Sequence, residues 1–158
     1  MNHLSKLTFP IILILLVSCG FKVLDKSSLN KLKINEINTV GDKRINFLIK
    51  NRITKLINSN ITEELININI NSKKNKSIKE KNKKNKITKY RIEVVSKLEI
   101  LFLSKKIKKE FTILEEGYYN VTDNNNTNRE NQKQLENNLS ENISQEIIKN
   151  IFRVINDN

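Results

Sequence analysis

The chain has 158 residues, of which Asn, Ile and Lys supply 26, 24 and 24, and it contains no Ala. Its formal net charge is +12, from 29 Lys and Arg residues against 17 Asp and Glu residues. With a single Cys and a single His in the sequence, disulfide scaffolds and zinc sites built from Cys and His are excluded. The hydrophobic share of 37% is low but is enough for a small folded core.

The first 18 residues have the organisation of a bacterial signal peptide. A short segment that carries Lys6 precedes an apolar run from Leu7 to Val17. This run of 11 residues is shorter than the roughly 20 residues that a helix needs to cross a bilayer, and it has the length of a signal-peptide hydrophobic region. We therefore expect residues 1–18 to be removed from the mature protein.

The signal peptide ends in Leu16-Val17-Ser18-Cys19, which resembles the lipobox of bacterial lipoproteins. In that motif a diacylglyceryl group is joined to the cysteine sulfur before cleavage, so Cys19 is the predicted lipidation site. Three acyl chains on one cysteine hold a protein on a membrane far more firmly than one chain does. Gly20 rather than Asp follows the cysteine, which by the sorting rules of lipoproteins indicates the periplasmic side of the outer membrane. An ordinary secretory signal with a chance cysteine, or a buried thiol, is the alternative.

Alternating and helical patterns predict six elements after a polar tether over residues 20–28. Apolar residues from Leu32 to Val40 predict a first strand over about 31–38. Gly41 ends this strand, and Asp42 can cap a helix of about 15 residues. The apolar stripe of that helix consists of Ile45, Leu48, Ile49, Ile53, Leu56 and Ile57.

The remainder of the chain predicts three strands and a second helix. Residues 65–71 and 90–102 alternate with period two, which is typical of strands in an antiparallel sheet with one covered face. A turn at 104–106 leads into a fourth strand that extends to about Val121. Thr127 and Glu130 form a predicted capping box for the last helix. Its apolar face consists of Leu135, Leu139, Ile143, Ile147, Ile148, Ile151, Phe152 and Ile155.

The order strand, helix, strand, strand, strand, helix predicts an α+β fold. Two helices packed on one face of a four-stranded, mainly antiparallel sheet would bury each apolar stripe once. We expect three parts: the lipoprotein signal peptide at 1–18, the lipidated Cys19 with its tether over 19–28, and a single α+β domain over 29–158.

Four short motifs and the order of elements resemble the LPS-assembly lipoprotein E (LptE) family. The mature start, Cys-Gly-Phe and a nearby Leu, is the most specific of them. The chain lacks the Arg-Gly that often follows this start in the family. The motifs lie at 19–24, at 41–44 before the first helix, at 90–94 in a central strand, and at 116–123 in the fourth strand.

The resemblance implies a role that is not enzymatic and needs no cofactor or metal. Members of the family sit as a plug inside the outer-membrane β-barrel LptD. The two proteins insert lipopolysaccharide into the outer leaflet, and the lipoprotein also helps the barrel to assemble. The expected partners are therefore LptD, lipopolysaccharide and, through the lipid anchor, the membrane.

The positive charge is concentrated in residues 72–86, which we call the Lys-rich segment. It carries +7, and the rest of the mature chain carries only +4. We interpret it as a hairpin tip that binds the phosphates and acidic sugars of lipopolysaccharide, because mobile ammonium groups suit loose binding to a polyanion. The alternative is a solvated loop whose Lys residues reflect A/T-rich codon usage. The candidate residues are Lys73, Lys74, Lys76, Lys79, Lys81, Lys83, Lys84 and Lys86.

Two other functions compete with this hypothesis. One is a different envelope lipoprotein that serves as an auxiliary subunit of a transporter or of a barrel-assembly complex. The other is a nucleic-acid binder, which the signal peptide contradicts and which lacks aromatic residues between the lysines. The paired carboxylates Glu63-Glu64 and Glu115-Glu116 have no nearby His or nucleophile in the sequence, so we interpret them as surface charges.

Overall fold

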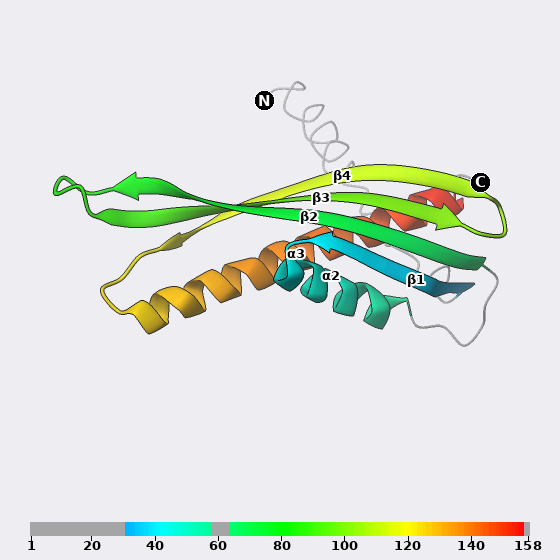
Figure 1. Cartoon of the computed structure of the whole chain (residues 1–158), viewed down its shortest axis with the longest axis horizontal. Coiled ribbons are helices and arrows are strands. Elements are labelled where there is room, and N and C mark those ends of the chain that lie inside the picture. Colours follow the sequence, from blue (N-terminus) through cyan, green and yellow to red (C-terminus); the bar gives the residue numbers. More distant parts are fainter. Residues whose placement is uncertain (1–30, 58–63, 157–158) are drawn as a thin grey trace, which may run out of the picture.

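The computed structural model describes residues 31–57 and 64–156. The predicted signal peptide, Cys19 and the tether lie outside these residues. In chain order the elements are β1 (Leu32–Gly41), α2 (Lys43–Leu56), β2 (Glu64–Lys81), β3 (Ile87–Phe102), β4 (Ile107–Asn120) and α3 (Asn125–Asn156). The sheet has the order β1-β2-β3-β4, with β1 parallel to β2 and the other pairs antiparallel. Both helices cover one face of the sheet (Figure 1), which confirms the predicted α+β fold.

The core lies between the sheet and the two helices. Alternate residues of β2 and β3 face the helices, and the side chains between them face the opposite, open side of the sheet. A buried row such as Ile68 opposite Ile100 is fully excluded from solvent. The strand residues buried in the core are Leu32, Ile66, Ile68, Ile70, Ile92, Val94, Leu98, Ile100, Phe102, Ile113 and Tyr119.

Helix α2 begins where the sequence predicts. The Asp42 side chain accepts a hydrogen bond of 2.9 Å from the backbone N–H of Ile45, which is the expected N-cap geometry. Ile45, Ile49 and Ile53 are fully buried. The predicted stripe was too wide at its end, because Leu56 is 49% exposed on the outer side of the helix.

Helix α3 begins earlier than predicted, so the capping box of Thr127 and Glu130 is wrong. The cap is Asn124, whose side-chain oxygen accepts hydrogen bonds from the backbone N–H groups of Asn126 (2.8 Å) and Thr127 (3.3 Å). Thr127 therefore lies in the first turn of the helix. Most of the predicted apolar face is confirmed. Leu139, Ile143, Ile147, Ile148 and Ile151 are buried, and Leu135 and Ile155 pack partly buried against the core. Phe152 is only half-buried, and Val154, which was not predicted, is buried.

Strand β1 leaves the sheet at Gly41, which is paired with Ser72 of β2. Gly41 has φ +97°, and a Cβ atom there would lie 2.1 Å from the backbone oxygen of Ser72, so only glycine fits this position. The same oxygen accepts a hydrogen bond of 2.8 Å from the N–H of Asp42. The chain thus turns away from the sheet and enters α2, and no described strand continues beside β2 on that side.

Strand β2 is much longer than the predicted strand over 65–71. It runs through most of the Lys-rich segment, and its pairing with β3 extends from Ile66 to Lys81. Only residues 82–86 connect the two strands. The expectation that the whole segment forms a hairpin tip is therefore wrong, because β3 supplies a partner strand for residues 72–81.

Candidate functional site

Most of the Lys-rich segment lies at one end of the molecule, and only its first residues, Ser72 and Lys74, reach the end of β1 and the start of α2 (Figure 1). We call residues 73–95, which form the β2–β3 hairpin beyond Ser72, the distal hairpin. Its boundary is marked by a buried hydrogen bond of 2.8 Å between the hydroxyl groups of Ser72 and Ser96. The N-terminal turns of α3 and the end of β4 are the elements that face it. Within this end, the eight candidate lysines occupy four different environments.

Lys74 belongs to a partly buried ion-pair network. Its ammonium group lies 3.0 Å from a carboxylate oxygen of Glu136 and 3.2 Å from one of Asp42. The second Glu136 oxygen accepts a hydrogen bond of 2.7 Å from Nε of Arg44. Glu136 is 2% exposed, so its charge requires these partners. The network joins β2, α2 and α3, and Lys74 is a structural residue rather than part of a mobile cationic surface.

The pKa values of the network reflect this arrangement. Burial by itself would raise the pKa of Glu136, but hydrogen bonds from Gln132 and Lys74, together with the charge of Lys74, lower the pKa below its ordinary value. Burial likewise opposes the charged form of Lys74, and the carboxylates of Glu136 and Asp42 outweigh burial and raise its pKa. Both groups are thus held in their charged forms.

Lys76 lies next to a pair of stacked tyrosines. The Tyr90 and Tyr119 ring centroids are 5.6 Å apart, and the Lys76 ammonium lies 4.2 Å from the Tyr90 centroid. This ammonium also donates a hydrogen bond of 2.8 Å to the side-chain oxygen of Gln132. Since Gln132 donates to Glu136 at 2.9 Å, the buried network continues into the distal end through α3.

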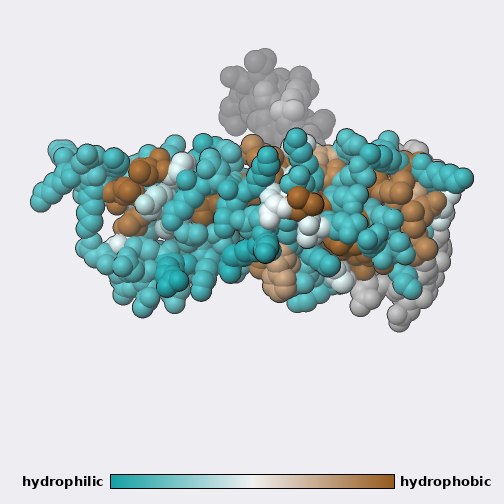
Figure 2. Space-filling view, in the orientation of Figure 1, coloured by the Kyte–Doolittle hydropathy of each residue, from teal (hydrophilic) through white to brown (hydrophobic). Residues whose placement is uncertain are grey.

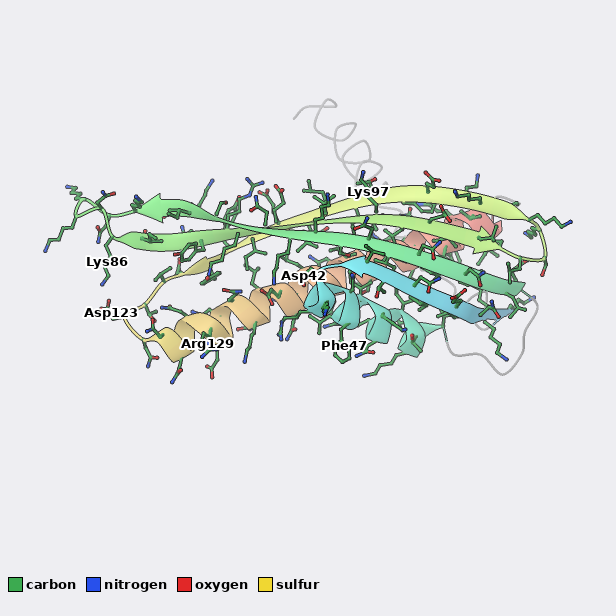
Figure 3. All side chains as sticks on the ribbon, in the orientation of Figure 1. Asp42, Phe47, Lys86, Lys97, Asp123 and Arg129 are labelled. Carbon is green, nitrogen blue, oxygen red and sulfur yellow. The ribbon has the colours of Figure 1, made fainter. Side chains whose placement is uncertain are left out.

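A cleft of about 480 Å³ opens between the distal hairpin and the start of α3. Its cations are Lys76 and Arg129, and Arg129 lies on the first turns of α3 (Figure 3). The lining includes no carboxylate, and the two tyrosines supply a flat apolar wall. The cleft is therefore suited to an anionic group attached to a ring or chain that packs on the tyrosines. Its lining residues are Lys76, Tyr90, Tyr119, Val121, Asn125, Asn128, Arg129 and Gln132.

The outermost lysines surround the turn of the hairpin. The Asn82 side-chain oxygen accepts hydrogen bonds of 3.0 Å from the backbone N–H groups of Lys84 and Lys86, which fixes the turn. The Lys86 ammonium pairs with Asp123, which precedes α3 (Figure 3). Lys81, Lys83 and Lys84 are exposed, and the tip of the hairpin is hydrophilic (Figure 2).

Two lysines lie on the open face instead. Lys73 is exposed there, and the Lys79 ammonium lies 5.2 Å from the centroid of the Tyr118 ring. Tyr118 donates a hydrogen bond of 2.7 Å to Glu116, which also pairs with Arg91. The hydrogen bond from Tyr118 is the main cause that lowers the pKa of Glu116 below its ordinary value, and the hydrogen bond from Arg91 adds to it.

The structure therefore divides the sequence-predicted site. It brings Lys76 to a cleft, gathers the tip lysines at one end, places Lys73 and Lys79 on the other face, and removes Lys74 from the candidates for loose polyanion binding. Sequence reasoning missed Arg129 and Gln132 as neighbours of the lysines, because they are more than 50 residues away along the chain and nothing local marks them. Cys19, the predicted lipidation site, lies outside the described residues.

Over residues 31–57 and 64–156, no cluster of His, Cys, Asp and Glu has the arrangement of a metal site. Neither helix in these ranges has the length and hydrophobicity needed to cross a membrane.

Comparison with known proteins connects this fold to bacterial lipoproteins. No protein-family model matches the chain, and no curated protein gives a significant match. Solved structures do match. The crystal structure of rare lipoprotein B from Shewanella oneidensis has a TM-score of 0.52 at 11% identity, over 76% of this chain and 98% of that one.

Two further structures extend the similarity over more of this chain. A candidate lipoprotein from Caulobacter crescentus gives a TM-score of 0.56 at 10% identity, over 84% of this chain and 95% of that one. An uncharacterized lipoprotein B from Nitrosomonas europaea gives a TM-score of 0.54 at 11% identity, over 87% of this chain and 93% of that one. The chain thus shares a fold with bacterial lipoproteins.

Proposed function

We propose that this protein is an outer-membrane lipoprotein that acts as the plug subunit of a lipopolysaccharide translocon. The observation that carries the proposal is the combination of a lipobox ending at Cys19 with a fold shared with rare lipoprotein B. The sequence resemblance to the LptE family supports the same role. In this role the protein is not an enzyme, needs no cofactor, and has a β-barrel related to LptD as its partner.

The distal end supplies the surface for the lipopolysaccharide. The exposed tip lysines attract its phosphates and acidic sugars over a distance, and this attraction is weakened by salt. The cleft at Lys76 and Arg129 then receives one anionic group next to the tyrosine wall. The ion pair between Lys74 and Glu136 holds the hairpin against α3. The tip lysines and the cleft therefore keep a constant position relative to each other.

Lipidation is tested with a Cys19→Ser variant. The thiol is the acceptor of the lipid, so the variant should remain an uncleaved and unlipidated precursor. Metabolic labelling with a palmitate analogue should mark the wild type and leave the variant unmarked. Equal labelling of the two proteins would contradict the assignment as a lipoprotein.

The plug role is tested by affinity purification of the lipidated protein from membranes. Co-purification of a large outer-membrane β-barrel together with lipopolysaccharide is expected. Purification with a transporter or a barrel-assembly complex instead would favour the second candidate, an auxiliary subunit of such a complex. That outcome would leave the lipoprotein assignment intact.

A further inference from the structure

Gln132 lies on α3 between the buried ion-pair network and the cleft. Its side-chain N–H group donates a hydrogen bond of 2.9 Å to Glu136, one helical turn further along α3. Its side-chain oxygen accepts a hydrogen bond of 2.8 Å from the Lys76 ammonium and a longer one, of 3.3 Å, from the Tyr119 hydroxyl. One amide therefore joins a nearly fully buried carboxylate to a cation of the cleft.

The chemistry of these partners fixes the orientation of the Gln132 amide. The carboxylate of Glu136 only accepts hydrogen bonds, and the ammonium of Lys76 only donates them. An amide turned the other way would place its oxygen against the carboxylate and its N–H groups against the ammonium, and both contacts would be repulsive. The oxygen of Gln132 must therefore face the cleft.

This orientation also affects what the cleft can bind. A carbonyl oxygen has two lone pairs, and the donors of Lys76 and Tyr119 occupy both of them on Gln132. An ammonium has three N–H groups, so Lys76 keeps donors for a ligand after its bond to Gln132. The arrangement favours a group that only accepts hydrogen bonds, such as a phosphate or a carboxylate.

Lys76 depends on this hydrogen bond for its position. Its side chain is exposed, and a long, flexible lysine side chain loses rotamer freedom when its ammonium is held in one place. The ammonium lies 4.2 Å from the Tyr90 centroid and 5.3 Å from the Tyr119 centroid, and such contacts are weak at exposed sites. Over residues 31–57 and 64–156, no carboxylate forms an ion pair with it.

Lys74, two residues earlier on the same side of β2, is held in a different way. Its ammonium pairs directly with the carboxylates of Glu136 and Asp42, which neutralise its charge. Lys76 reaches Glu136 only through the neutral amide of Gln132. The amide therefore places the Lys76 cation and leaves its charge available to an anion.

We propose that Gln132 is a positioning residue of the cleft: oriented by Glu136, it holds the Lys76 ammonium beside the two tyrosines, where the anionic group is received. The inference rests on the proposed function, because the anionic group is one of lipopolysaccharide. It adds a neutral residue that acts on the ligand through Lys76.

The first test follows the position of Lys76 and needs no lipopolysaccharide. The lysines of the full-length chain in detergent micelles are methylated with isotope-labelled formaldehyde and a hydride donor, which keeps their charge. The tyrosine rings should shift the methyl signal of Lys76 upfield, and a Lys76→Arg variant identifies this signal by its absence. In Gln132→Met, which keeps the side-chain length and the helix propensity, the signal should move to the position of an exposed lysine such as Lys83.

The matched control is Gln134→Met. Gln134 is exposed, lies two residues further along α3 and is not among the residues that line the cleft. The Lys76 signal should keep its upfield position in this variant. Circular dichroism checks that each variant is folded, and Gln132→Ala, with the strongest helix former, replaces Gln132→Met if that chain does not fold.

The second test is a double-mutant cycle on binding of purified lipopolysaccharide at physiological salt. Gln132→Met and Lys76→Gln should each weaken binding several-fold. The double variant should bind no more weakly than Lys76→Gln alone, because Gln132 acts only through Lys76. If Gln132 touched the ligand itself, the two losses would multiply.

Two results would overturn the inference. They are an unmoved Lys76 signal in Gln132→Met, and losses of binding that multiply in the double variant. A wild-type chain that shows the upfield Lys76 signal but binds no lipopolysaccharide would instead contradict the proposed function. In that case, loss of the upfield shift in Gln132→Met would still establish that Gln132 positions Lys76.

Discussion

The ammonium group of Lys74 lies 3.0 Å from the carboxylate of Glu136, and this pair joins the long strand β2 to helix α3. The two residues are 62 positions apart in the chain. Glu136 is almost completely buried, and Lys74 is only 21% exposed. One lysine of the Lys-rich segment therefore holds the fold together, while those of the tip extend into solvent.

Replacement of Glu136 by Gln should destabilise the protein at pH 7 by roughly 1.5–3 kcal/mol, because charged hydrogen bonds from Arg44 and Lys74 are lost. The pKa of Glu136 is below its ordinary value of 4.5, so its stabilising contribution is present above that pH and is lost as pH falls through the folded-state pKa. The difference between wild type and variant should therefore shrink at pH 3. Urea unfolding at pH 7 and pH 3 measures the difference in free energy of unfolding between wild type and variant. A difference of the same size at pH 3 would contradict the charged role of Glu136.

Replacement of Lys81, Lys83, Lys84 and Lys86 by Gln should weaken binding to purified lipopolysaccharide at low salt and make its salt dependence shallower. These side chains lie outside the core, so the free energy of unfolding should change by less than about 0.5 kcal/mol. Binding titrations at several salt concentrations and thermal melts check both expectations. Unchanged binding at low salt would identify the tip as a solvated connection with Lys residues that reflect codon usage.

A second variant separates the cleft from the tip. Replacement of Lys76 and Arg129 by Gln removes both cations of the cleft and leaves the tip intact. If the cleft receives an anionic group, this variant should lose more binding at physiological salt than the tip variant, because contacts within a cleft are screened less than exposed ones. The same lipopolysaccharide titrations compare the two variants. Equal losses of binding would show that the cleft and the tip do not differ in their contribution.

The assignment of the faces of α3 is tested by two neighbouring residues. Ile147 is 1% exposed, so Ile147→Asp places an unpaired charge in the core and should destabilise the protein by several kcal/mol. Glu146 lies on the outside and pairs with Lys149 at 3.0 Å, so Glu146→Lys should change stability by less than about 0.5 kcal/mol. Thermal melts followed by circular dichroism compare the two variants. Similar shifts would show that the helix faces are assigned wrongly.

Two glycines provide a further comparison. Gly41→Ala combines a positive φ with a Cβ atom 2.1 Å from a backbone oxygen, so it should destabilise the protein by more than about 1 kcal/mol. In Gly117→Ala the new Cβ atom lies 2.5 Å from the terminal Cδ1 atom of Leu135, which can move. The Gly117 variant should therefore lose less stability than the Gly41 variant in urea unfolding. The reverse order would contradict the role of Gly41 as the point where β1 leaves the sheet.

The element order, most of the apolar faces and the Asp42 cap can be predicted from the sequence alone. These features depend on local spacing: apolar residues at alternate positions in β2 and β3, and at every third or fourth position in α2 and α3. Such periodicity survives in a single sequence because burial of one face imposes it. The cap of α3 was misplaced because several consecutive residues, Asn124 among them, can cap a helix, and local chemistry does not choose between them.

The role of each lysine, in contrast, depends on contacts that form only when the chain folds. All eight lysines of the Lys-rich segment have the same local appearance in the sequence. Their environments differ because strand alternation sends Lys74 and Lys76 toward α3 and sends Lys73 and Lys79 toward the open face. The partners Glu136, Gln132 and Arg129 come from a helix more than 50 residues away. Ion pairing and cleft formation depend on such distant neighbours, which the period of a strand does not encode.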